Sequence, residues 1–168
     1  GTHTITPLSA LPAITDDVLL DATTDDSFPV NGGNPAVVLD GDDLPGDGLT
    51  ISGGVFGSTV RGLVVRDFGG SGIEISAGAP GNVVAGTWLG RLTPAGGDAG
   101  VAEANGVDGV DVRSSANRIG GTAAADRNVL SGNAGHGVEL QGVGATANVV
   151  EGNLVGLDAV GTAVIANG

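Results

Sequence analysis

The sequence predicts an all-β chain folded as a right-handed parallel β-helix, a solenoid of stacked coils with roughly 22–28 residues in each coil. Glycine supplies 33 of the 168 residues, and aromatic residues make up only 2%. The apolar residues come in short bursts between Gly, Asn and Asp, which is typical of short strands joined by tight turns. Similar segments recur along the chain, and a hydrophobic content of 40% excludes a disordered chain.

A segment led by glycine is the clearest repeat. Its copies begin at Gly48, Gly72, Gly109 and Gly137, and the middle step is the longest of the three. Each copy alternates apolar, polar and apolar residues, which predicts a strand with one buried face. The long step from Gly72 to Gly109 contains the Gly- and Ala-rich stretch 91–104, which we interpret as a loop pushed out of one coil.

A second segment recurs, and a copy of the first segment comes before each of its copies. The stretches 82–90 and 148–156 agree in pattern at nearly every position, and the loop after each closes on Ala-Asn-Gly. A divergent copy stands between them, at 117–121 and 128–133. The recurrence predicts that these segments occupy equivalent places in successive coils.

Parallel stacking explains why such units recur. A unit of two or three short strands cannot bury its apolar side alone, so each strand pairs with its equivalent in the next coil. The core is then a column of Val, Ile and Leu, with Gly and Asn at corners where we expect positive φ. We expect Asn82, Asn117 and Asn148, which begin the second segment and its divergent copy, to form a stacked ladder at one corner.

The N-terminal part of the chain, 1–47, is less regular than the rest. Strands are expected at 4–6, 18–21 and 36–40, and the stretch 23–35 is expected to form an exposed loop. No linker separates this part from the regular coils at 48–168, so the chain from 1 to 168 is expected to form a single domain.

The segments GIEIS, GNVVAGTWLG and ANRIGG carry a resemblance to a known class. The region 47–168, and less closely 1–46, resembles the parallel β-helix repeats of large bacterial and archaeal surface proteins, which belong to the pectate-lyase-like superfold. The resemblance implies a prokaryotic, extracellular or cell-surface location. That superfold also hosts lyases, glycosidases, phage tailspikes and adhesins, so the resemblance does not choose an activity.

The charge of the chain restricts its partners. The 19 acidic residues face six arginines and no lysine, for a net charge of −13, which excludes nucleic acid and anionic lipid as direct partners. The sequence has no cysteine, so disulfides, zinc–thiolate sites and thiol nucleophiles are excluded, and no apolar run predicts membrane insertion. It also has no methionine and no recognisable signal peptide, and we expect a processed or excised piece of a longer or polymerising chain.

The best-defined candidate site is a row of carboxylates. Glu74, Asp111 and Glu139 are the polar residues in the middle of three copies of the first repeat, so we expect them on one outward face, about 5 Å apart. Such a row is either a strip that binds Ca²⁺ or sugar, or a solvated acidic face, with Arg113 able to relieve the repulsion locally. No cofactor is required, and Ca²⁺ is the one ion that the row suggests.

Other chemical candidates have simpler interpretations. The acidic pairs at 16–17, 25–26 and 42–43 are interpreted as turn residues rather than a glycosidase pair. His136 is interpreted as a surface turn residue, because the sequence indicates no further metal ligands for it or for His3. Trp88 is predicted to be core filler, since its repeat equivalent is Leu154. No lysine is present to act as the base of a polysaccharide lyase, and arginine is a poor substitute.

Two classes of function remain. The first is a non-enzymatic structural or adhesive module, either a rigid section of a surface protein or a fibre subunit that stacks through its coil ends. Its partners are then other copies or further coils of the same parent chain. The second is a carbohydrate-binding or polysaccharide-degrading protein that uses the acidic face, with extracellular glycans as partners. The lack of a convergent reactive cluster favours the first class over an enzyme.

Overall fold

The computed structural model describes residues 1–54 and 56–168, which form three parallel sheets of short strands. Sheet A contains β1 (His3–Ile5), β3 (Val37–Leu44), β6 (Leu63–Phe68), β9 (Trp88–Leu89), β12 (Val129–Leu130) and β15 (Leu154–Val155). Sheet B contains β4 (Leu49–Ile51), β7 (Ile73–Ile75), β10 (Val110–Val112) and β13 (Val138–Leu140). Sheet C contains β2 (Leu19–Asp21), β5 (Thr59–Arg61), β8 (Val83–Ala85), β11 (Arg118–Gly120) and β14 (Val149–Glu151).

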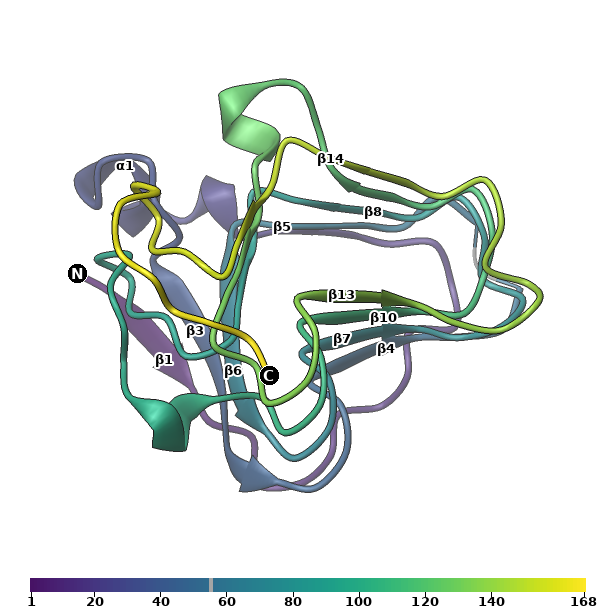
Figure 1. The fold of residues 1–168 in the computed structure, drawn as a ribbon, viewed down its shortest axis with the longest axis horizontal. Coiled ribbons are helices and arrows are strands. Elements are labelled where there is room, and N and C mark those ends of the chain that lie inside the picture. Colours follow the sequence, from purple (N-terminus) through teal and green to yellow (C-terminus); the bar gives the residue numbers. More distant parts are fainter. Residues whose placement is uncertain (55) are drawn as a thin grey trace.

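The chain visits the three sheets in turn, and each visit adds one strand to the same edge of each sheet. Figure 1 shows the result, with β4, β7, β10 and β13 side by side below β5, β8 and β14, and with β3 and β6 closing the third side. The predicted all-β class and the parallel pairing of equivalent strands are confirmed. This arrangement is compatible with the predicted solenoid.

The strand register reproduces the repeats. In sheet B, Leu49 pairs with Ile73, Ile73 with Val110, and Val110 with Val138, so each strand pairs with the next copy of the first repeat. In sheet C, Arg118 lies between Val83 and Val149, so the two similar copies of the second segment are two coils apart.

Coil length varies more widely than predicted. Trp88 of β9 pairs with Val129 of β12, so this coil is far longer than the predicted range. Part of the excess is the predicted loop at 91–104, which holds the 3₁₀ turn η2 (Val101–Glu103). The rest is an insertion at 121–127 around η3 (Ala124–Asp126), which the repeats did not indicate.

The main core is the column enclosed by the three sheets. Its fully buried members come from every sheet and include Leu89 and Leu130 from sheet A, Ile73 and Val110 from sheet B, and Ile119 from sheet C. Burial of one such side chain contributes roughly 1.5–3 kcal/mol. The expected column of aliphatic side chains is therefore the main source of stability.

A second core lies on the other side of sheet A. Neighbouring residues of a strand point to opposite faces, and Val65 belongs to the main core while Val64 packs with Trp88. The loops after β9 and β15 cover this face with Leu92 and Ile165. Trp88 is buried as predicted, but in this outer cluster.

The prediction of positive φ at corners is confirmed for glycines such as Gly57, Gly81 and Gly152, but it was wrong for the asparagines. The ladder asparagines and the repeat glycines are absent from the positive-φ residues of the described chain. In sheet C, positive φ falls one residue before the ladder, at Gly57, Gly81, Ala116 and Ala147. Gly109 is required for another reason, because a Cβ there would lie 2.5 Å from the carbonyl oxygen of Gly137 in the next coil.

The N-terminal region contains the expected strands at β1, β2 and β3. The stretch 23–35 is not a simple exposed loop, since it includes the short helix α1 (Ser27–Val30) and the buried Ser27, after the 3₁₀ turn η1 (Ala22–Thr24). In the described residues, no helix is both long and apolar enough to span a membrane.

Candidate functional site

The predicted carboxylate row exists on sheet B. Asp111 of β10 pairs with Glu74 of β7 on one side and with Glu139 of β13 on the other. The three therefore lie in neighbouring coils, as expected. They point away from the main core, as expected, because the residues that flank Glu74 and Asp111 belong to it. The face is not a freely solvated one, since Asp111 is only 2% exposed and the other two are partly buried.

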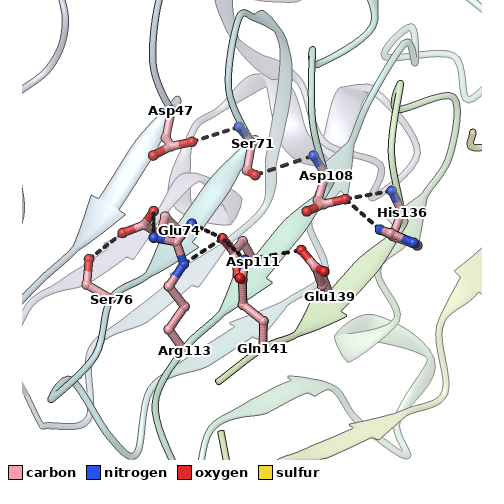
Figure 2. Close-up of polar contacts among 10 residues, drawn as sticks. All are labelled: Asp47, Ser71, Glu74, Ser76, Asp108, Asp111, Arg113, His136, Glu139 and Gln141. Carbon is pink, nitrogen blue, oxygen red and sulfur yellow. Dashed lines mark hydrogen bonds and ion pairs between the residues drawn. The ribbon is translucent and has the colours of Figure 1, made fainter. Parts of the chain in front are cut away.

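Arg113 explains the burial of Asp111. Its Nη2 lies 2.6 Å from Asp111 Oδ2, its Nε donates to the same oxygen at 2.9 Å, and its Nη1 lies 3.2 Å from Glu74 Oε2. The hydrogen bond with Asp111 raises the pKa of Arg113. Gln141 Nε2 donates to Asp111 Oδ2 at 3.0 Å and to Glu139 Oε2 at 3.2 Å (Figure 2). The first two members of the row thus share an arginine, and the third has only an amide.

A second polar row runs beside the first, and the sequence analysis missed it. Ser71 N donates to Asp47 Oδ1 at 2.7 Å, Asp108 N to Ser71 Oγ at 3.3 Å, and His136 N to Asp108 Oδ1 at 2.6 Å (Figure 2). Each of these residues directly precedes a glycine of the first repeat. That position was the available signal, but its residue types differ from coil to coil.

The two rows meet at Asp108, His136 and Glu139. Each of the three offers a ligand atom, and these atoms lie within 4.8 Å of one another. Asp108 is 1% exposed, while the side chain of His136 is 65% exposed and places Nδ1 3.1 Å from Asp108 Oδ1. Burial and the neighbouring negative charges of Asp108 and Asp111 raise the pKa of Glu139. His136 does lie in an exposed turn, but the prediction that it lacks neighbouring ligands was wrong.

A third acidic cluster, formed by Asp40, Asp67 and Glu103, already contacts the positively charged side chain of Arg66. Arg66 Nη2 lies 2.8 Å from Asp40 Oδ2 and 3.1 Å from Glu103 Oε2. Burial and the negative charges of Asp43, Asp40 and Glu103 raise the pKa of Asp67. This cluster is therefore a place where ionisation of one carboxyl opposes folding.

Asp67→Asn is expected to stabilise the protein at pH 7 by less than about 1 kcal/mol, because Asp67 is partly exposed and its repulsion is screened. A raised pKa in the folded state means that the contribution of Asp67 is fully present below its unfolded pKa and is lost as pH rises through its folded pKa. Urea unfolding of both proteins should therefore diverge at pH 7 and coincide near pH 3. Asn tolerates the positive φ of 58° at this position. Equal stabilities at both pH values would refute the interpretation.

The three acidic pairs have different local roles in the structure. Asp25 Oδ1 accepts from Ser27 N at 2.9 Å, Asp17 Oδ1 accepts from Phe56 N at 2.7 Å, and Asp42 and Asp43 both have positive φ. The turn interpretation is confirmed for the pair at 25–26, whereas Asp42 and Asp43 lie at an irregularity of β3 and Asp17 bonds a residue distant in the sequence.

An open groove of about 840 Å³ lies along the turns between sheets B and C. It is lined by the turns of successive coils, with the exposed ring of Phe56, then Pro80, Arg113 and Gln141. The groove therefore shares two residues with the surroundings of the carboxylate row, and Trp88 is not part of it.

Comparison of the chain with protein-family models, with curated proteins and with solved structures finds no match.

Proposed function

We propose that the chain is a non-enzymatic structural module, a rigid section of a prokaryotic surface protein or fibre built as a right-handed parallel β-helix. The observation that carries the proposal is that, in the described residues, the strands at both ends of the coil stack have an unpaired edge beside exposed apolar side chains. The resemblance to β-helix repeats of surface proteins and the strongly acidic composition support an extracellular location.

The end formed by β13, β14 and β15 exposes apolar side chains. Leu140, Val149, Val150 and Val155 are between 43% and 52% exposed, whereas Val112, Ile119 and Leu130, which are the partners of Leu140, Val150 and Val155 one coil back, are fully buried.

The end formed by β1 and β2 has the same character. Ile5 and Leu19 are more than half exposed, and the outer edges of both strands have no partner strand in the described residues. Unpaired strand edges beside exposed apolar residues are stable when another strand covers them. We infer that further coils cover both ends, and that in a solution of this chain a second copy takes that place.

Solutions of the purified chain are expected to contain rods that lengthen with protein concentration, measured by light scattering and electron microscopy. Val150→Lys should keep the chain monomeric, because it places a charge on the open end. Val101→Lys is the control, since Val101 is exposed in η2, on a side loop. A mass that stays monomeric at every concentration, or equal assembly of both variants, would refute the proposal.

The groove favours carbohydrate binding as a second candidate. It combines an exposed aromatic ring at Phe56 with the planar polar groups of Arg113 and Gln141, a combination of apolar surface and few polar groups that suits a ligand site. Under this candidate, acidic or neutral polysaccharides retain the chain on a column and Phe56→Ala abolishes the retention. Absence of retention removes the candidate, and release of shortened polysaccharide would contradict the non-enzymatic proposal.

A further inference from the structure

Two buried carboxylate oxygens have no hydrogen-bond donor in the structure of the described residues. Among the described residues, Asp108 Oδ2 and Asp111 Oδ1 are buried and accept no hydrogen bond. A buried carboxylate whose oxygen lacks a partner is costly unless a proton, a cationic side chain or a metal ion compensates it. Each of the two carboxylates therefore needs a source of compensation.

Asp111 has its compensation within the chain. Its Oδ2 contacts two nitrogens of Arg113 and accepts a hydrogen bond from the amide of Gln141. The guanidinium therefore neutralises the charge of Asp111, although Oδ1 has no donor. Asp108 is different. Its Oδ1 contacts only the backbone N and the Nδ1 of His136, and the one further side chain that approaches, that of Glu139, is also an acid.

The repeat provides an internal comparison. Asp47 and Glu74 occupy, two coils earlier, the positions that correspond to Asp108 and Glu139. Glu74 is held by Arg113 Nη1 at 3.2 Å and by Ser76 Oγ at 2.5 Å. The intermediate coil avoids the problem because Ser71 replaces the first acid.

The pair Asp108–Glu139 has no such partner. Glu139 receives a hydrogen bond from the amide of Gln141, and in the described residues no arginine forms an ion pair with either acid. Figure 2 shows the Glu139 carboxylate beside that of Asp108, with the guanidinium of Arg113 on the far side of Asp111. Two acids from successive coils therefore face one another, and among the described residues the one cationic group beside them is His136, which is charged only when protonated.

We propose that this corner binds a single hard divalent cation of the Ca²⁺ type, held by Asp108 Oδ2 and a Glu139 carboxylate oxygen and completed by water. The free donors are oxygens, which Ca²⁺ prefers, and ligand atoms within 4.8 Å of one another suit bonds of about 2.3–2.6 Å to a common ion. His136 Nδ1 already contacts Asp108 Oδ1, so His136 orients the carboxylate. The ion links β10 to β13. The site is not the predicted strip of Glu74, Asp111 and Glu139, because Arg113 already forms ion pairs with the first two.

Calorimetric titration of the chelator-treated chain with CaCl₂ tests the proposal. Its outcome does not depend on whether the chain assembles through its ends. We expect one saturable site per chain with a Kd of about 10⁻⁴ to 10⁻³ M, and a rise in melting temperature when Ca²⁺ is added. Glu139→Gln and Asp108→Asn should each weaken the affinity at least about tenfold, as loss of one charged ligand of a weak site implies.

Two variants separate loss of the ion from loss of the fold. Asp108→Asn preserves Oδ1 as the acceptor for His136 N, so the polar row survives, and without Ca²⁺ this variant should melt at or above the wild-type temperature. Glu74→Gln is the matched control in the same row, and it should leave Ca²⁺ binding unchanged. Absence of saturable binding, or equal binding by Glu139→Gln, overturns the proposal and leaves a proton shared by the two acids as the compensation.

Discussion

Gly109→Ala is expected to destabilise the fold by about 1–3 kcal/mol, the usual cost of forcing atoms into a packed core. A Cβ at Gly109 would lie 2.5 Å from Gly137 O and 3.1 Å from Asn133 Nδ2, both in the next coil. Gly137 O also accepts the hydrogen bond from Val110 N at 3.1 Å, so the chain cannot move away without losing the sheet B pairing.

Urea unfolding followed by circular dichroism measures this effect. Gly97→Ala is the control, because a Cβ at Gly97 would meet its nearest atom at 4.0 Å and the residue does not have positive φ. We expect this control to unfold at the wild-type midpoint. If Gly109→Ala also does so, successive coils do not approach as closely as the register requires.

Asn117→Ala is expected to cost about 3 kcal/mol, since buried groups left unpaired cost roughly 1–3 kcal/mol each. Asn117 Oδ1 accepts from the backbone N of Asn82 at 2.9 Å and from its Nδ2 at 3.2 Å, and both residues are almost fully buried. Asn117 Nδ2 donates onward to Asn148 Oδ1 at 3.1 Å. The substitution therefore breaks the ladder in the middle.

Two variants separate ladder bonding from side-chain volume. Asn117→Asp keeps the acceptor for Asn82 but turns an oxygen toward Asn148 Oδ1, so its loss relative to wild type should shrink at low pH, where the new acid can donate. Asn148→Ala should cost less, because Asn148 is only partly buried. If Asn117→Ala lowers the free energy of unfolding by less than about 1 kcal/mol, the expectation is wrong, because the ladder then contributes no more than one ordinary hydrogen bond.

Much of the fold was predictable because the repeat directly encodes register. The spacing of the glycines from Gly48 to Gly137 matches the pairing steps of sheet B, since a glycine is needed wherever a coil passes against the carbonyl of its neighbour. The ladder from Asn82 to Asn148 was predictable for a similar reason, as a buried amide can both accept and donate along the stack. Positive φ was the right reason for corner glycines such as Gly81, but the wrong reason for the asparagines, because positive φ falls on the residue before each of them.

The candidate site was only half predictable. The alternation in the repeat placed Glu74, Asp111 and Glu139 in one row, but burial depends on which coil supplies Arg113. Asp108 escaped notice because the residue before the repeat glycine is Asp, Ser, Asp and His in successive coils, with no common type to recognise. Its approach to Glu139 joins residues of two successive coils that are distant in the sequence, and it follows only from the geometry of the stack.

The central claim, that the open ends stack on further coils, is tested most directly by disulfide cross-linking between copies. Leu19, Thr59, Val83, Arg118 and Val149 form one column of paired residues across sheet C, so a second copy stacked in register places its Leu19 next after Val149. Neighbours in such a column lie about 5 Å apart, within disulfide reach, and the chain has no cysteine of its own. The double variant Leu19→Cys, Val149→Cys should give a ladder of head-to-tail multimers on oxidation, while each single variant gives none. A double variant that stays monomeric, or single variants that cross-link equally, would contradict the account.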